Sequence, residues 1–402
     1  MPDPTHEDLT HEKLTELRAR MAAFIDDEVI PAEKALAGRT PEARTTLAAL
    51  QERAKKLDLW ILGHPAELGG KGLPLYEFAL INEIIGRSEY GQLAVGTYTM
   101  QDSIMLDLYA SRAQRERWLK PLVNAEISPS VGLTEPEVAG SDPTRIATTA
   151  MLDGDEWVIN GHKWFTTGAS RAAFTTVFAR TDEDAASPHG AVSAIIVPAG
   201  TPGLEISRVL ETMGDTEGDH CELRLTDVRV PADHLLGERG EGFTIAQRRL
   251  GPGRIFHCMR WLGQAQRAFE LMVERANTRY AHGSLLAEKG EIRRYVAESA
   301  AEIQAARLMT LDAARRYDQD GQARLEISMV KFWGAQVLHN VVDRAIQVHG
   351  ALGVTADTPL EGMYRRARYA RIYDGPDEVH RMVVARKLLA DVSRAPWAGL
   401  PA

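Results

Sequence analysis

The stretch Gly132-Leu133-Thr134-Glu135-Pro136-Glu137-Val138-Ala139-Gly140-Ser141-Asp142 lies at the point where the hydrophobic periodicity of the chain changes. In residues 1–128, apolar side chains recur at helical spacing. In residues 129–240 the period falls to two, and Gly, Pro, Asp and Thr separate short alternating runs. The helical period returns in residues 241–402. We therefore predict an α+β protein with an N-terminal all-helical domain, a central β-domain built as a barrel or sandwich, and a C-terminal four-helix bundle domain.

Individual elements follow from these two periods. Alternating residues predict strands at 157–161, 192–198, 222–225 and 228–231. The polar segment 181–190 lies between two of these runs and is expected to form a hairpin tip.

Helices are predicted wherever apolar residues stand three or four positions apart. Near the N-terminus, Thr5-His6-Glu7-Asp8 is a candidate capping signal for the first helix. In the last part of the chain, long helices are expected at 262–280, from 292 onward and at 327–348. A final helix is expected from about 378 to 392.

The composition limits the possible functions. The chain has 402 residues, with 47 Lys and Arg against 56 Asp and Glu, for a formal net charge of −9. This balance argues against a nucleic-acid scaffold, because phosphate binding requires a basic face. Cys221 and Cys258 cannot form a disulfide framework, and so small a cysteine count fits a reducing, cytoplasmic location. No apolar run reaches the roughly 18 residues of a membrane helix, so we expect no membrane span.

Several common catalytic motifs are absent from the sequence. It contains no GxxxxGKS or GxxxxGKT phosphate loop, no HExxH and no GxSxG. Gly251-Pro252-Gly253-Arg254 precedes a helical pattern but follows no strand, so it lacks the context of a dinucleotide fingerprint. The scattered histidines are more typical of solvated side chains than of metal ligands, and we expect no metal site.

Three clusters remain that could carry chemistry: the stretch quoted above, Gly161–Gly168 and Arg371–Arg381. The first combines hydroxyls with carboxylates, the second places aromatic rings beside hydroxyls, and the third has acids at an expected helix start. Each has a purely structural alternative. These are a linking loop with Asx and Ser turns, a strand whose rings pack into the core, and a capped helix start.

Taken together and in this order, the clusters resemble the acyl-CoA dehydrogenase family over nearly the whole chain. Thr134-Glu135-Pro136 with Gly140-Ser141-Asp142 is similar to the flavin-binding loop of that family. Ile372-Tyr373-Asp374-Gly375 stands where the family carries its catalytic I-Y-E-G. Further stretches that match family motifs are Asp227-Val228-Arg229-Val230-Pro231 and Gln347-Val348-His349-Gly350-Ala351-Leu352-Gly353.

Within the family, the chain resembles most the 10/11-type subgroup. The similarity lies in Lys163–Ala169, Leu250–Arg254 and Asp374–His380. Some members of that subgroup carry a fused kinase-like domain, which this sequence is too short to include. The family fold, a helical domain, a β-domain and a four-helix bundle, agrees with the order of periods described above.

The resemblance implies FAD as the cofactor. By position, Phe165 would lie against the flavin ring and Thr167 would hydrogen-bond near its N5 atom. Arg279 and the loop at Gln347 would reach the FAD of a neighbouring subunit, which implies a homo-oligomer, either a dimer or a dimer of dimers (a homotetramer). The cofactor-binding residues implied are Leu133, Thr134, Gly140, Ser141, Phe165, Thr166, Thr167, Arg279, Gln347, Gly350, Gly353, Pro376 and Glu378.

The resemblance also implies α,β-desaturation of an acyl-CoA thioester, as in fatty acid β-oxidation. Asp374 would abstract the α-proton while the β-hydrogen leaves as hydride to flavin N5, and an electron-transfer flavoprotein would accept the electrons. Ser141, Arg254 and Gly375 would contact the substrate. For Arg254, a helix-end salt bridge is the structural alternative. No motif reports the length or branching of the acyl chain.

The sequence departs from the family pattern at several positions. Asp374 is one methylene shorter than the usual Glu, and a displacement of about 1 Å can cost roughly a hundredfold in rate unless the backbone or the substrate compensates. The other departures, at positions that match cofactor contacts or polar segments of the family, are Pro376, His282, Gly290, Thr216 and Gly218.

Two other functions are compatible with the same residues. One is a flavin-dependent oxidase or monooxygenase on this scaffold, similar to the nitroalkane oxidases, in which Asp374 would deprotonate a carbon acid and oxygen would reoxidise the flavin. The other is a non-catalytic acyl-CoA-binding subunit. Peroxide formation would favour the first, and unchanged behaviour of an Asp374→Asn variant would favour the second.

Overall fold

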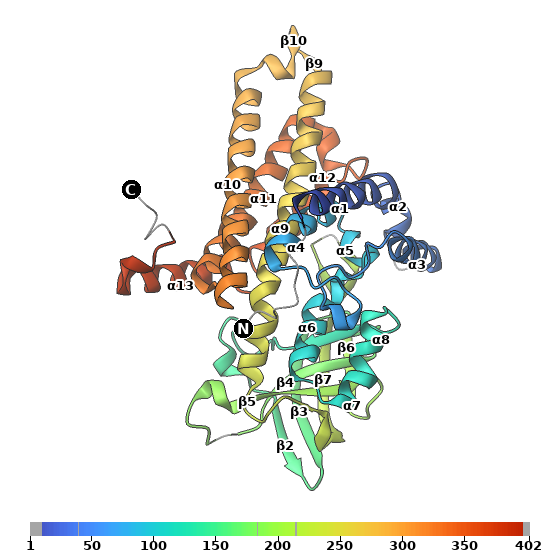
Figure 1. Cartoon of the computed structure of the whole chain (residues 1–402), viewed down its shortest axis with the longest axis vertical. Helices are drawn as coiled ribbons and strands as arrows, with labels where there is room; N and C mark the ends of the chain where they lie inside the picture. The colour runs from blue at the N-terminus through green and yellow to red at the C-terminus, as the bar shows by residue number, and fades with distance from the viewer. Residues whose placement is uncertain (1–9, 39, 183, 214, 397–402) are drawn as a thin grey trace. The chain divides into compact units, whose positions relative to one another are not determined.

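The computed structural model describes residues 10–38, 40–182, 184–213 and 215–396. The capping signal predicted at 5–8 lies outside these residues, and the side chains around Thr216 and Gly218 are not described either. Helices form the two ends of the described chain and strands form its middle, so the predicted fold class is confirmed (Figure 1).

Contacts within the chain define two compact units. The first contains residues 1–65, 71–95 and 251–402, and the second contains residues 66–70 and 96–250. Each unit has its own buried core, and each is described by itself below.

The N-terminal helices begin with clear capping signals. Thr10 and Thr40 cap α1 and α3, because each hydroxyl oxygen accepts a hydrogen bond from the backbone N–H three residues further on. In the first unit these helices are α1 (His11–Phe24), α2 (Glu33–Leu36), α3 (Pro41–Lys56), α4 (Leu75–Ile85) and α5 (Gly91–Ala94). In the second unit they are α6 (Met100–Tyr109), α7 (Arg112–Gln114) and α8 (Lys120–Val123).

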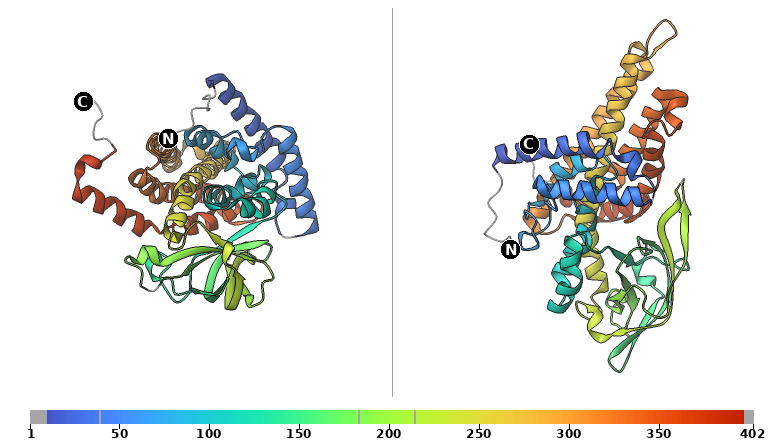
Figure 2. Two further views of the ribbon diagram at one scale, coloured as in Figure 1. Left: turned by 60° about the horizontal axis from the view of Figure 1, so that its bottom comes forward. Right: turned by 90° about the vertical axis from the view of Figure 1, so that its right-hand side faces the viewer.

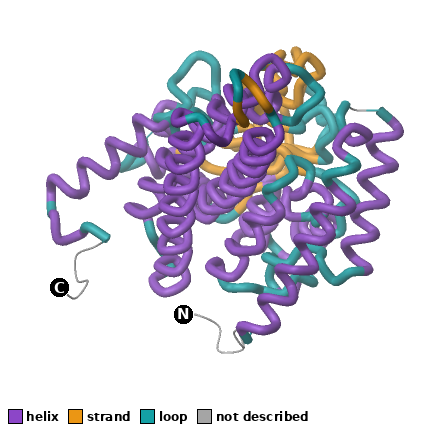
Figure 3. Tube along the Cα trace, turned by 90° about the horizontal axis from the view of Figure 1, so that it is seen from above, coloured by secondary structure: helices purple, strands orange, loops and turns teal. Residues whose placement is uncertain are grey.

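The second unit is built on an eight-stranded sheet in the order β6-β7-β3-β2-β4-β5-β8, with β1 paired in parallel to β4. Figure 3 shows its strands gathered in one group. The predicted strand at 192–198 is confirmed as β5, and the runs predicted at 222–225 and 228–231 are parts of one long strand, β7. The strands are β1 (Pro129–Gly132), β2 (Thr149–Asp153), β3 (Glu156–Thr167), β4 (Phe174–Arg180), β5 (Val192–Pro198), β6 (Leu204–Thr212), β7 (Asp215–Pro231) and β8 (Leu235–Leu236).

The sheet closes around a single apolar core. Strands β5 and β7 are separated by three other strands in the sheet order. Nevertheless, Ile195 and Val197 of β5 share one buried cluster with Leu223 and Val228 of β7. The sheet must therefore curl so that its two halves face each other, as the views in Figure 2 show for the strands coloured green.

The C-terminal part of the first unit is a helical bundle around α11, whose apolar residues are buried along its whole length. Figure 1 shows α10 and α11 running side by side. The sequence did not predict α12, whose four buried residues are separated by Arg, Tyr and Glu. Among the described residues, no helix is long and apolar enough to cross a membrane. The helices are α9 (Gly242–Thr278), α10 (Gly290–Asp320), α11 (Arg324–His349), α12 (Leu360–Ala370) and α13 (Asp377–Ala390), with a hairpin of β9 (Tyr280–Ala281) and β10 (Ser284–Leu285) between α9 and α10.

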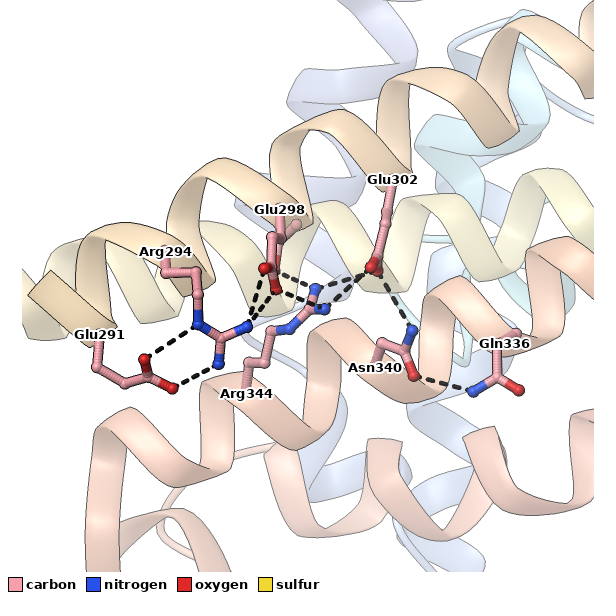
Figure 4. Close-up of polar contacts among 8 residues, drawn as sticks. Glu291, Arg294, Glu298, Glu302, Gln336, Asn340 and Arg344 are labelled. Carbon is pink, nitrogen blue, oxygen red and sulfur yellow. Dashed lines mark hydrogen bonds and ion pairs between the residues drawn. The ribbon is translucent and has the colours of Figure 1, made fainter.

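An ion-pair network joins α10 to α11 (Figure 4). The guanidinium of Arg344 on α11 lies 2.9 Å from a carboxylate oxygen of Glu302 and 3.1 Å from one of Glu298, both on α10. Arg294 contacts Glu291 and Glu298 along α10 itself. Only Arg344 among these arginines links two helices, and its side chain is 15% exposed against 50% for Arg294.

We expect Arg344→Met to lower the free energy of unfolding by about 1–2 kcal/mol, because two carboxylates of α10 then lose a half-buried, charged donor. The matched change Arg294→Met removes two exposed pairs within one helix and is expected to lower the free energy of unfolding much less than Arg344→Met does. Urea unfolding of both variants followed by circular dichroism measures the difference. Equal losses of unfolding free energy in the two variants would show that linking α10 to α11 adds no stability beyond that of a pair within one helix.

Candidate active site

The loop that follows β1 carries the first motif, in the second unit. The carbonyl of Thr134 accepts a hydrogen bond from the backbone N–H of Trp164 at 3.0 Å, which ties the loop to β3. Gly140 packs on the same threonine, because a Cβ at position 140 would lie 2.8 Å from Thr134 Cγ2. A larger residue there would displace the loop. Leu133 is half-buried and Ser141 is exposed at the end of the turn.

A buried ion pair lies under this loop. Lys163 Nζ is 2.7 Å from Glu135 Oε1, and the two side chains are 0% and 2% exposed. Burial lowers the pKa of Lys163 to about 8. Burial alone would raise the pKa of Glu135, but the charge of Lys163 and hydrogen bonds at Thr148 and Ala147 lower it below its ordinary value. Neither residue of the pair is among the site residues predicted from the sequence.

The end of β3 is irregular, and this irregularity exposes an aromatic ring. The register between β3 and β7 shifts between Lys163 and Thr166. At this point Phe165 has φ 49°, in the left-handed region, and its side chain is 45% exposed. Thr167 Oγ1 lies 2.9 Å from His220 Nδ1, and the ring of His220 lies 5.5 Å from that of Phe165. The sequence did not predict His220, because it reaches the site from β7.

The strand end borders a cavity and carries unsatisfied polar atoms. The cavity has a volume of about 420 Å³ and is lined by Trp164 and Phe165 and by residues 208–211 of β6. Trp164 Nε1 and Thr166 Oγ1 are buried and have no hydrogen-bond partner in the described part of the chain. Buried polar groups are nearly always paired, so these two atoms are candidates for contact with a polar ligand. An exposed ring beside hydroxyls and unsatisfied polar atoms fits a flat cofactor with a polar edge, as FAD is.

Asp374 lies in the first unit, in the turn between α12 and α13. Its φ is 55°, a left-handed conformation that Asp tolerates better than most residues. Gly375 has φ 101°, and a Cβ there would lie 2.7 Å from His380 Nε2, so only Gly fits. The Asp374 carbonyl accepts hydrogen bonds from Arg254 Nε at 2.9 Å and from His380 Nε2 at 3.2 Å. The backbone of this turn is thus held from α9 and from α13.

Two buried groups hold the same turn from other directions. Lys331 of α11 donates to the carbonyls of Ala370 at 2.9 Å and of Gly375 at 3.1 Å. Burial lowers the pKa of Lys331, and these two carbonyls stabilise its ammonium. Asp377, which is 1% exposed, pairs with Arg371 at 2.8 Å across the turn. The position of Asp374 is therefore determined by a dense set of contacts rather than by a flexible loop.

The Asp374 carboxylate contacts a histidine. Its Oδ2 lies 3.0 Å from Nε2 of His257 on α9, and each of the two side chains is 18% exposed. Burial lowers the pKa of His257 and of Arg254, and lowers that of His380 to about 4, so both histidines are neutral at pH 7. A partly exposed carboxylate in a turn surrounded by cationic side chains is suited to removing a proton from a carbon acid and to stabilising the charge that develops.

Comparison with known proteins identifies the family. Models of the N-terminal, middle and C-terminal domains of acyl-CoA dehydrogenases match residues 11–126, 130–228 and 240–389. The chain belongs to the acyl-CoA dehydrogenase family. The resemblance stated from the sequence is thereby confirmed, and family membership makes the protein an FAD-dependent oxidoreductase.

Individual acyl-CoA dehydrogenases are similar over most of the chain. The "Probable acyl-CoA dehydrogenase FadE2" of Mycobacterium tuberculosis is 42% identical over 398 residues, which cover 95% of this chain and 96% of that protein. Acyl-CoA dehydrogenase family member 11 of Rattus norvegicus is 38% identical over 94% of this chain, but the chain spans only 51% of that longer protein. The crystal structure of acyl-CoA dehydrogenase from Geobacillus kaustophilus has a TM-score of 0.82 at 28% identity, covering 96% of this chain and 100% of the other.

The remaining cofactor residues predicted for this acyl-CoA dehydrogenase lie at or near helix ends in the first unit. Arg279 follows the last residue of α9 and is exposed, as is Gln347 near the end of α11. Gly350 has φ 64°, which few other residues adopt. A Cβ at Gly353 would lie 2.7 Å from the carbonyl oxygen of Ile346, so this glycine is required by packing within the loop.

The positions that depart from the family pattern have simple structural settings. Pro376 is the N-cap of α13 and offers no N–H to a ligand. Glu378 follows in the first turn, with its side chain 76% exposed. His282 is exposed in the turn between β9 and β10, with φ 49°, and Gly290 is the first residue of α10.

The structure groups the predicted residues within each unit and adds others. Arg254, Asp374 and Gly375 meet in the first unit, whereas Thr134, Gly140 and the end of β3 are neighbours in the second. Sequence reasoning missed His257 and Lys331. Since His257 follows Arg254 by three residues in a helix, that spacing could have placed both on one face.

Proposed function

We propose that this acyl-CoA dehydrogenase introduces an α,β double bond into an acyl-CoA thioester, with Asp374 as the base that removes the α-proton. The observation that carries the proposal is the Asp374 turn. The backbone of Asp374 is held in a left-handed conformation by hydrogen bonds to its carbonyl oxygen, and its carboxylate contacts a neutral histidine. The carboxylate therefore has one defined position. Such preorganisation is what proton abstraction from a weak carbon acid requires.

In the proposed reaction, the C–H bond at the α-carbon gives its proton to the Asp374 carboxylate, and the α,β double bond forms from that electron pair. FAD, when bound, supplies the acceptor for the hydride that leaves the β-carbon. The backbone N–H of Asp374 would polarise the thioester oxygen as negative charge develops there. Arg254 contributes twice, because it fixes the Asp374 carbonyl and places a cation next to the anionic CoA. We assign Ser141 and Gly375 to substrate contact on their motif positions.

We assign cofactor binding to the loop after β1 and to the end of β3, because Trp164 Nε1 and Thr166 Oγ1 are buried without partners there. Phe165 offers an exposed ring surface, and the hydroxyl of Thr167 lies beside it. The other assignments, Leu133, Thr134, Gly140, Arg279, Gln347, Gly350, Gly353, Pro376 and Glu378, follow the motif positions.

The physiological setting is proposed on chemical grounds. An electron-transfer flavoprotein would take the electrons, and a homodimer or dimer of dimers would complete the cofactor contacts of Arg279 and Gln347. Both cysteines of the described chain are free and buried, which is compatible with the proposed reducing, cytoplasmic location.

The test is anaerobic titration of the purified flavoprotein with a panel of saturated acyl-CoA thioesters. We expect loss of the oxidised-flavin absorbance with at least one chain length, and no loss with the corresponding 2-enoyl-CoA, whose α,β bond is already a double bond. Peroxide formation from a nitroalkane without bleaching by any thioester would replace the proposal with the oxidase reading. A protein that holds no FAD would overturn both.

A further inference from the structure

The contacts of His257 determine where its proton lies. Arg260 Nη2 is 2.7 Å from His257 Nδ1. A guanidinium group has no acceptor, so Nδ1 must accept this hydrogen bond and carries no proton. In a neutral imidazole the proton is then on Nε2, the atom that lies 3.0 Å from Asp374 Oδ2. Burial lowers the pKa of His257, and although Asp374 opposes this effect, Arg260 adds to it, which favours the neutral ring.

The ring of His257 is also held in place by aromatic side chains. It lies 5.0 Å from the ring of Tyr373 at 70° and 6.0 Å from that of Trp261 at 21°. Trp261 Nε1 donates to the Tyr373 hydroxyl at 2.8 Å, so the two aromatic residues hold each other. The position of the His257 ring, with Nε2 3.0 Å from Asp374 Oδ2, is therefore set by the fold.

We propose that His257 is a positioning residue for proton abstraction: its Nε2–H, oriented by Arg260, holds Oδ2 of Asp374 and fixes the plane of the carboxylate. This inference rests on the proposed function, because it assigns His257 to the same base. The contact also bears on the shorter side chain of Asp374. An Asp carboxylate extends less far from the backbone than a Glu carboxylate, so its orientation matters more, and the contact with His257 fixes that orientation. A tautomer fixed by one partner and directed at another is a common device for orienting a reactive group.

The other polar groups around the turn have different tasks. Arg254 and His380 donate to the Asp374 carbonyl, and Lys331 donates to the carbonyl of Gly375. These groups come from α9, α13 and α11 and fix the backbone, whereas His257 contacts the reacting side chain itself. Substitution of His257 should therefore change how the carboxylate works and leave its turn in place.

The experiment compares His257→Phe with His257→Gln and with the control His339→Phe. Phe keeps the ring contacts with Tyr373 and Trp261 but removes the donor, whereas Gln retains an N–H of similar reach. His339 is another histidine of the first unit, 5.1 Å from the ring of Tyr364, so its replacement makes the same change away from Asp374. We expect the limiting rate of flavin reduction to fall roughly 10- to 100-fold in His257→Phe, with less than about a twofold change in acyl-CoA binding. His257→Gln should recover most of the rate, and His339→Phe should match the wild type.

Two further measurements distinguish a role in orienting the Asp374 carboxylate from a loss of structure around it. In His257→Phe, the acid side of the pH–rate profile should move to higher pH, because the carboxylate loses a donor that favours its charged form. On the reduced enzyme, which cannot accept hydride, deuterium uptake at the α-carbon measured by NMR should slow by the same factor as flavin reduction.

An unchanged rate, pH profile and deuterium exchange in His257→Phe would overturn the inference. The proposed function would still stand if acyl-CoA bleached the flavin of the wild type. Equal losses in Phe and Gln with an unmoved profile would also overturn it, in favour of a structural role. Absence of bleaching in the wild type itself would instead mean that the proposed function is wrong.

Discussion

Asp374→Asn is expected to slow flavin reduction by acyl-CoA by roughly 10²–10⁴-fold or more, because the variant has no group at position 374 that can accept the α-proton. The change is nearly isosteric. Asn tolerates the left-handed φ of 55° as Asp does, and it can keep an oxygen beside His257 Nε2, where Asp374 Oδ2 lies at 3.0 Å. The carbonyl contacts with Arg254 and His380 do not involve the side chain. The fold and the bound flavin should therefore be retained.

Two companion variants make this result specific. Asp374→Glu keeps a carboxylate but moves it by about one methylene, so we expect an intermediate loss of roughly a hundredfold. Asp357→Asn removes an exposed carboxylate elsewhere in the same unit and should have no effect. Stopped-flow reduction under anaerobic conditions gives the rates, and equilibrium titration gives acyl-CoA affinity. An Asp374→Asn protein that is reduced at the wild-type rate would exclude Asp374 as the base.

The order of the large elements could be predicted from the sequence because the apolar residues of each element repeat with one clear period, either that of a strand or that of a helix. Strand β5 has Val192, Ala194 and Ile196 at alternate positions. Helix α11 has apolar residues every third or fourth position along its length. The helix α12 was missed for the opposite reason. Its buried residues Leu360, Met363, Ala367 and Ala370 have helical spacing, but two are only alanines and the rest of the helix is polar and Arg-rich. Short elements with little apolar area give a weak periodic signal.

The residues of the candidate site fall into two groups: those that belong to one short motif, and those that are brought together only by tertiary packing. Asp374 and Gly375 belong to one short motif and could be predicted together. Nothing in the spacing of residues 257 and 374 reports that their side chains lie 3.0 Å apart, because that contact depends on how α9 packs against the turn. Lys331 is harder still, since a lysine within an apolar helical pattern reads as an exposed position until its two carbonyl partners are known. Motifs identify reacting groups, whereas the residues that hold them come from tertiary packing.

The Glu135–Lys163 pair is the clearest example in the second unit. Lys163 Nζ donates to Glu135 Oε1 and to the carbonyl of Phe178, both at 2.7 Å, and to the carbonyl of Leu133 at 3.3 Å. Glu135 in turn accepts the backbone N–H groups of Ala147 and Thr148. The pair thus joins β3, β4, the loop after β1 and the segment before β2. Every charge in it is satisfied, which is the condition under which a buried ion pair is tolerated.

Lys163→Met should therefore destabilise the second unit by about 3–5 kcal/mol, because a buried carboxylate loses its cation while remaining out of contact with water. The matched control is Lys120→Met, which breaks the pair between Lys120 and Glu116, whose side chains are 61% and 57% exposed, and should leave the free energy of unfolding nearly unchanged. Urea unfolding, followed by circular dichroism and by flavin release, measures both. FAD affinity should also fall in Lys163→Met, because the loop at Leu133 loses its buried anchor. If both lysine variants unfold at the wild-type urea concentration, the buried pair does not stabilise the loop after β1.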